Sequence, residues 1–163
     1  MFDLRDLPDA TTLEGFGKRF PELDVSALQV VLRLARLGED LVRLMQDGLM
    51  REGLSLRRFF VLVLLARNAE GLRAVGLAKK MGVTKATVSE VLAGMARDKL
   101  VLSSADPEDS RAQLVTLSEQ GKALLDAVLP GHYQRLAGVV EGLDGDERAE
   151  LLRLLAIVGN GLS

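Results

Sequence analysis

Midway along the chain, the spacing of apolar residues changes from the three-and-four repeat of helices to the alternation of short strands. Residues 100–103 and 113–117 predict two strands, and the polar segment at 105–111 between them predicts the loop of a hairpin. Two helical segments, residues 74–81 and 84–99, come directly before this hairpin. Two short helices followed by a hairpin leave few possible folds, and the order is typical of a winged helix-turn-helix.

Longer helices are predicted before this module. Asp24 can cap a helix whose apolar stripe runs to Gly53, and Ser55 can cap the next helix, which extends to about residue 67. That second helix is apolar around most of its circumference, so we expect it to lie centrally. Residues 1–23 contain glycine and proline breaks and predict an arm with at most one short helix.

Two further helices are predicted after the hairpin. Ser118 caps the first, which we expect to be interrupted at residues 130–131 (Pro-Gly) and to end near Gly142. Asp144 starts the last helix, whose leucine-rich face continues to Val158. The stripes of the first helix and the last two lie outside the winged module. Their natural partners are each other and the same helices of a second copy.

The predicted fold class is therefore mainly α with a small β-hairpin, a winged helix-turn-helix plus a helical dimerisation region. The expected domains are an N-terminal arm at residues 1–23, a dimerisation region at 24–54 and 118–163, and a DNA-binding module at 55–117.

Composition narrows the function classes. The chain has no cysteine, which excludes disulfides and thiolate metal sites. Its net charge is −2, yet residues 55–112 carry ten basic and six acidic side chains, as a phosphate-facing module requires. The N-terminus is acidic, and no apolar run reaches membrane-spanning length, so we expect a cytoplasmic protein with no membrane partner.

The second short helix predicts a DNA-reading surface. Val88, Val91, Leu92 and Met95 recur at helical spacing and should point inward. Small and polar side chains on the opposite face suit a helix that enters the major groove, although an ordinary solvated helix surface explains them as well. These outward residues are Ala86, Ser89, Glu90, Ala93 and Arg97, flanked by Lys85 and Thr87.

The hairpin loop favours the DNA-binding interpretation. Arg111 sits at the base of an otherwise acidic loop, two residues after Asp109. A carboxylate there can hold the guanidinium in one orientation for entry into a narrow minor groove. The alternative is a solvated surface ion pair that contributes little energy.

These residues carry a resemblance to a known family. The run GLAKKMGVTKATVSEVLAGMARDKLVLSSADPEDSRAQLVTLSEQGKALL resembles the reading helix and wing of MarR-type regulators, and the likeness extends over roughly residues 24–160. The resemblance implies a homodimer that binds a pseudo-palindromic DNA operator. It also implies release of that double-stranded DNA by a small, often aromatic or phenolic, effector.

Matched position by position, residues 84–90 correspond to the reading helix, and Asp109 and Arg111 to the wing's Asp-x-Arg. Glu90 and the serines at 103, 104 and 110 depart from positions that are often basic or non-acidic in the family, which predicts weaker binding and a shallower salt dependence. The expected DNA-binding residues are Thr84, Lys85, Ala86, Thr87, Ser89, Glu90, Ser110 and Arg111, with Asp109 as wing support.

An effector pocket is expected between the DNA-binding module and the dimerisation region, although core packing explains its aromatic candidates equally well. His132 is the only histidine, so neither a metal site nor a catalytic set is predicted, and neither an enzyme nor a cofactor is expected. The candidate pocket residues are Arg33, Arg36, Phe59, His132 and Tyr133.

The function predicted from the sequence is a homodimeric, sequence-specific transcriptional regulator, a repressor modulated by a small effector. The alternative is a winged-helix protein–protein interaction scaffold without DNA binding. The weakly basic wing and Glu90 motivate that alternative.

Overall fold

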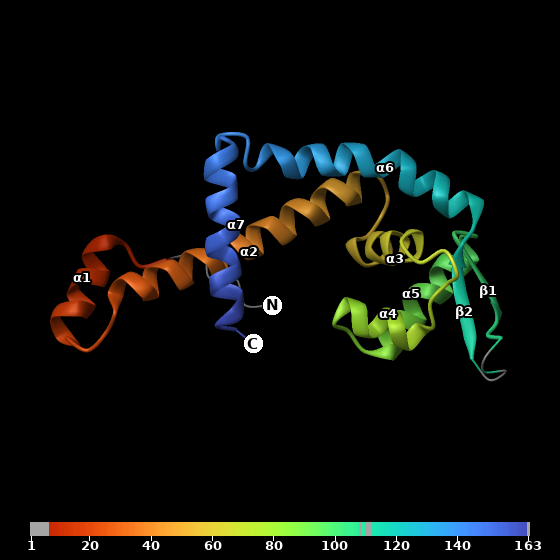
Figure 1. Ribbon diagram of the computed structural model, residues 1–163, viewed down its shortest axis with the longest axis horizontal. Coiled ribbons are helices and arrows are strands. Elements are labelled where there is room, and N and C mark those ends of the chain that lie inside the picture. The colour runs from red at the N-terminus through yellow and green to blue at the C-terminus, as the bar shows by residue number, and fades with distance from the viewer. Residues whose placement is uncertain (1–6, 108, 110–111, 163) are drawn as a thin grey trace. The chain divides into compact units, whose positions relative to one another are not determined.

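The computed structural model describes residues 7–107, 109 and 112–162, which form two compact units divided after Asp47. The first unit holds a short helix and most of a long one, and the second holds the remaining elements (Figure 1). Along the chain the elements are α1 (Ala10–Arg19), α2 (Val25–Arg51), α3 (Leu56–Ala66), α4 (Ala74–Met81), α5 (Lys85–Arg97), β1 (Val101–Ala105), β2 (Gln113–Leu117), α6 (Glu119–Gly138) and α7 (Gly145–Asn160).

In the first unit, both helices begin at an aspartate. Asp9 accepts the Thr12 N–H at 2.8 Å, and Asp24 accepts the Ala27 N–H at 2.9 Å. These hydrogen bonds hold the pKa of each carboxyl below its usual value, because backbone N–H groups favour the ionised form. The cap predicted at Asp24 is confirmed, and the described part of the arm contains the single short helix expected there.

In the second unit, α3 is the central element, as predicted from a sequence that is apolar around most of the helix. It packs against α4, α5, α6 and β2. Ser55 caps it by accepting the Arg58 N–H, and Leu62 is fully buried. The core around it contains Leu49, Leu54, Phe59, Val61, Leu62, Leu65, Leu77, Ala78, Val88, Met95, Leu100, Val101, Val115, Leu117, Leu125 and Val128.

The hairpin pairs Val101 with Leu117 and Ala105 with Gln113 in an antiparallel register. Its first strand starts one residue later and ends two residues later than predicted, because pairing continues until the Asp106 N–H bonds the Ala112 carbonyl. The strand therefore reaches into the segment that the sequence assigns to the loop.

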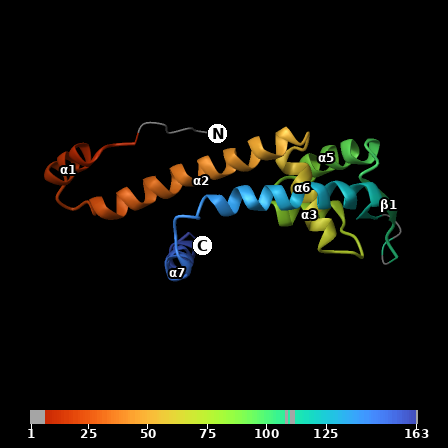
Figure 2. The ribbon, with the colours of Figure 1, turned by 90° about the horizontal axis from the view of Figure 1, so that it is seen from above.

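The helix after the hairpin is not interrupted. α6 runs continuously from Glu119 to Gly138 through Pro130, so the predicted break at residues 130–131 is wrong. Leu125, Val128 and His132 are buried on both sides of the proline. That packing holds the helix together although the proline lacks an N–H to donate. Figures 1 and 2 show α6 passing over α3.

The close contact between α6 and the hairpin requires a glycine. A Cβ at position 121 would lie 2.1 Å from the Leu100 carbonyl oxygen. Ser118 adds to this contact, since its hydroxyl accepts the Gly121 N–H at 2.9 Å and donates to the Lys99 carbonyl at 2.6 Å. The start of α6 is thus tied to the end of the reading-helix segment.

The last helix differs from the others in its packing. Asp144 and Glu147 form a capping box at the start of α7, as expected for a helix that begins at Asp144. No described residue of α7 is buried, and its leucines face solvent. Among the helices that the structure describes, none is long and apolar enough to span a lipid bilayer.

Candidate nucleic-acid interface

The helix predicted to read DNA is held by one apolar face. Val88 and Met95 on α5 are fully buried, and Val91 and Leu92 are half-buried, as predicted. Thr84 caps the helix by accepting the Thr87 N–H at 3.2 Å. This inward face packs against α3, α4 and β1 and so fixes which side chains point outward.

The outward face of α5 is small and polar. Lys85, Ala86, Ser89 and Glu90 are all exposed, while Thr87 is half-buried because its hydroxyl lies 2.9 Å from that of Thr84. Apart from the flexible Lys85 and Glu90, the exposed side chains in this first half of the helix are small, so a nucleic-acid groove can approach closely. The structure thus places the predicted reading residues on one open surface.

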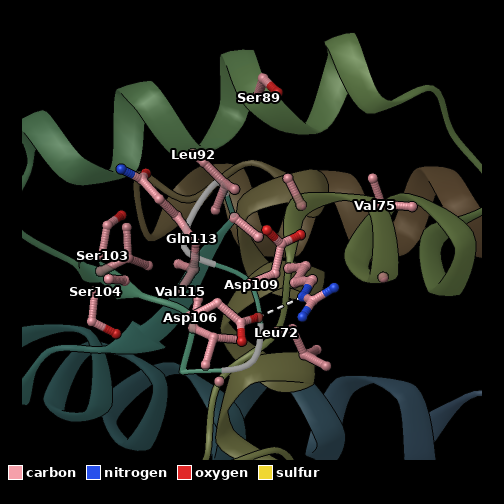
Figure 3. A pocket seen from close by; sticks show the side chains of 18 of the residues that line it. Leu72, Val75, Ser89, Leu92, Ser103, Ser104, Asp106, Asp109, Gln113 and Val115 are labelled. Carbon is pink, nitrogen blue, oxygen red and sulfur yellow. Dashed lines mark hydrogen bonds and ion pairs between the residues drawn. The ribbon is translucent and has the colours of Figure 1, made fainter.

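A groove of about 1450 Å³ lies between α5, the start of α4 and the hairpin (Figure 3). Ser89 and Leu92 border it from α5, and Ser103 and Ser104 border it from β1. Gln113 completes the hairpin side, so the walls mix hydroxyl and amide groups with apolar atoms. Ser103 and Ser104, which the resemblance compares with positions that are often basic, are therefore part of this surface.

The wing residues are only partly described. Ser110 and Arg111 lie outside the described residues, so their DNA contacts remain predictions. Asp109 borders the groove, and its carbonyl accepts the Ala112 N–H at 2.8 Å. Its role as support for Arg111 also remains a prediction.

The structure adds two residues that the sequence analysis did not single out. The Arg73 guanidinium, just before α4, pairs with the Asp106 carboxylate at the end of β1, with Nε 2.5 Å from Oδ2 (Figure 3, dashed line). Asp106 is buried although it stands in a polar loop sequence. The one available signal was an arginine where a helix-capping residue is expected.

The candidate effector residues are distributed over both units. Phe59 and His132 are buried in the second unit with ring centroids 4.5 Å apart, whereas Tyr133 is half exposed. Burial lowers the pKa of His132, and the positive charge of Arg135 lowers it further, so the imidazole is neutral at neutral pH.

Arg33 and Arg36 lie on α2 in the first unit. Arg36 pairs with Asp40 at 2.9 Å, and Arg33 borders a small hollow next to α1. The structure brings Phe59 close to His132, and His132 close to Tyr133, with centroids 6.0 Å apart in the second pair. The assignment of the two arginines to an effector pocket remains a prediction.

The sequence can now be compared with known proteins. A model of the MarR family matches residues 54–112, which span α3 to the wing. The HTH-type transcriptional repressor YetL of Bacillus subtilis is 30% identical over 162 residues, covering 99% of this chain and 97% of YetL. The chain belongs to the MarR family. Its winged helix-turn-helix is the DNA-binding module of these transcriptional regulators.

Solved structures of other proteins share this fold. BpsR of Bordetella bronchiseptica is 30% identical, with a TM-score of 0.66 over 80% of this chain and 98% of BpsR. That structure concerns the regulation of BpsR DNA binding by 6-hydroxynicotinic acid. CouR of Rhodococcus jostii RHA1, bound to p-coumaroyl-CoA, is 25% identical with a TM-score of 0.68 over 79% of this chain and 90% of CouR.

Proposed function

We propose that this MarR-family chain is a homodimeric, sequence-specific DNA-binding repressor whose operator binding is modulated by a small aromatic or phenolic effector. The observation that carries the proposal is the open outward face of α5. Its small and polar side chains stand over a fully buried apolar face, at the capped start of the helix. A surface built in this way can enter a major groove without moving its supporting core.

Individual residues on this face have different expected roles. Lys85 and the hydroxyl of Thr87 lie in the first turn, where phosphate and base edges are both within reach. Ser89 and Glu90 come one turn later and face the same side. A carboxylate can accept from the amino group of cytosine, so Glu90 is the candidate for base discrimination.

The proposed dimer is supported by apolar surface that the described residues of one copy leave exposed. Leu152 and Ile157 on α7 are 69% and 56% exposed, and α2 exposes Val31 and Leu37 in the other unit. Such surface favours association with a second copy. Two copies would present two α5 helices to successive major grooves, about 34 Å apart on a pseudo-palindromic operator.

The effector is inferred from relatives together with buried aromatic groups. BpsR is regulated by 6-hydroxynicotinic acid and CouR binds p-coumaroyl-CoA, and both ligands contain an aromatic ring. Phe59 and His132 are in contact, with ring centroids 4.5 Å apart and ring planes tilted by 54°, and are candidates to border such a ring. An effector can shift the equilibrium between the state that binds DNA and the state that does not only as far as its affinities for the two states differ.

The test is fluorescence anisotropy with labelled duplex from the DNA upstream of the gene, titrated across salt concentrations and against a scrambled duplex. Selective binding with a steep salt slope supports the proposal. Arg111→Ala should weaken binding to all sequences. Glu90→Gln should change the preferred base at one position in each half-site, by about 1–3 kcal/mol.

A matched control is Lys122→Ala, which removes one cation from the start of α6 and should leave binding unchanged. Equal affinity for operator and scrambled duplex, with no dependence on salt, would instead support the interaction scaffold.

A further inference from the structure

The start of α4 is unusual because an arginine occupies its N-cap position. Arg73 has the extended backbone of an N-cap residue, but its side chain makes no capping hydrogen bond to the first turn. Short polar side chains are favoured there because their oxygens accept free N–H groups, and the helix dipole disfavours a cation. Helix propensity and capping therefore give no reason for an arginine at this position.

The hairpin supplies the reason. The Arg73 guanidinium meets the Asp106 carboxylate, whose side chain is 4% exposed, while the Arg73 side chain is 42% exposed. A buried carboxylate is costly unless positive charge and hydrogen bonds compensate it. If the guanidinium were removed, the least costly response would be for the hairpin to move until water reaches Asp106.

A second attachment lies further along the hairpin. Leu72 and Val115 exchange two backbone hydrogen bonds of 3.0 Å each. The turn before them needs a glycine, because Gly71 has a φ of +91° and a Cβ there would lie 2.9 Å from the Val115 carbonyl oxygen. The base of the hairpin is also held by packing, since Val101, Val115 and Leu117 are buried in the core, but these contacts lie away from the loop. The ion pair of the buried carboxylate provides the attachment at the loop end.

We propose that Arg73 is the positioning residue of the wing. Its ion pair with Asp106 attaches the loop end of the hairpin to the start of α4. The position of the hairpin relative to α5 is therefore fixed. The consequence for DNA binding rests on the proposed function. A wing that is already held in place loses less entropy when it enters the groove beside the reading helix.

Hydrogen exchange of the protein without DNA tests the positioning directly. In Arg73→Ala, the amides of Leu72, Asp106 and Val115 should exchange at least about fivefold faster, because the local opening free energy falls. Amides in α3 and α6 should be unchanged. Lys122→Ala is the matched control, since Lys122 pairs with Glu119 at 2.7 Å in an exposed ion pair and its loss changes net charge equally. Unchanged hairpin exchange in Arg73→Ala would overturn the proposal.

Two further variants separate positioning from general stability. The double variant Arg73→Ala/Asp106→Asn also removes the buried negative charge that the Arg73 guanidinium compensates, so its melting temperature should return toward that of the wild type. Its hairpin should still exchange fast, because the attachment is absent. Arg73→Lys should restore slow exchange only in part, since an ammonium lacks the planar fork of a guanidinium. Slow exchange in the double variant would contradict a positioning role.

Operator binding gives an independent readout. Arg73→Ala should bind operator about tenfold more weakly and with a shallower salt slope, because wing contacts with phosphate and the minor groove are lost. The double variant should bind as weakly even though its stability recovers. If the wild type shows no selective DNA binding while the hairpin still responds to Arg73→Ala, the proposed function fails and the positioning role stands.

Discussion

The winged module and α7 have similar apolar periodicity but different environments. In the module, the repeat on α5 places Val88 and Met95 in full burial. On α7, a comparable repeat leaves Leu151 at 38% and Leu155 at 42% exposure. Both helices are well capped, by Thr84 and by the Asp144 box. The difference therefore lies in what covers each apolar face.

This contrast teaches that an apolar stripe specifies a face to be buried without specifying its partner. The module supplies its own partners, because α3 packs against four neighbouring elements. For α7 the partner that we propose is a second copy of the chain. The two regions should therefore respond differently to the same kind of substitution.

The largest expected effect is on the module core. Leu62→Ala removes a fully buried side chain and should lower the free energy of unfolding by about 2–5 kcal/mol, through lost burial and a residual cavity. Urea denaturation followed by circular dichroism measures it. Leu152→Ala, on the exposed side of α7, is the matched control and should change the unfolding midpoint little at low protein concentration. Equal losses for the two variants would remove the distinction between the regions.

A slightly smaller effect is expected when charge is placed on the α7 stripe. Leu151→Glu/Leu155→Glu should convert the proposed dimer to a monomer. Operator binding should weaken about a hundredfold, because each monomer then binds a single half-site without the second one linked to it. Light scattering after size-exclusion chromatography gives the mass, and anisotropy gives the affinity. Arg153→Glu, on the opposite side of α7 and equal in its change of net charge, is the control. A double variant that remains dimeric would show that α7 pairs with something else.

The helix caps allow a milder comparison. Ser118→Ala removes a hydroxyl that both caps α6 and bonds the Lys99 carbonyl, and should cost about 1–2 kcal/mol of unfolding free energy. Asp144→Ala removes the exposed cap of α7 and should cost less, since no described residue of that helix is buried. Paired urea titrations decide the order. A larger loss at Asp144 would mean that α7 contributes to the folding core.

The smallest expected effect is a pH dependence from His132, which is buried on α6. The folded protein keeps His132 neutral, since burial lowers its pKa, whereas in the unfolded chain it takes up a proton near about 6.5. Protonation therefore favours the unfolded state as pH falls below that value, and stability should rise with pH up to about 6.5 and then level.

His132 is the only histidine, so one imidazole signal in a proton NMR titration reports its pKa. Melting curves between pH 5.5 and 7.5 report the linked stability, and His132→Phe should flatten them. An unchanged slope in that variant would assign the pH dependence to other groups.

Much of the fold could be predicted from local signals. Asp24, Ser55, Thr84 and Ser118 all cap the helices that they precede, because a side-chain oxygen beside free N–H groups is a short-range interaction. The inward and outward faces of α5 also follow from its 3.6-residue period. The predicted reading residues therefore share one surface in the structure.

The errors and omissions arose where distant segments meet. α6 continues through Pro130 because residues on both sides of it are buried, which outweighs the local cost of the proline. Arg73 and Asp106 are 33 positions apart, and nothing local indicates that the carboxylate is buried or that the arginine before α4 pairs with it.

By itself, the sequence determined the kinds of element, their caps and the exposed reading face, because these depend on neighbours within a few residues. The tertiary structure alone decided which charges are buried, where the hairpin attaches and which apolar stripes remain uncovered. Those outcomes depend on desolvation and packing between elements that meet only after the chain has folded.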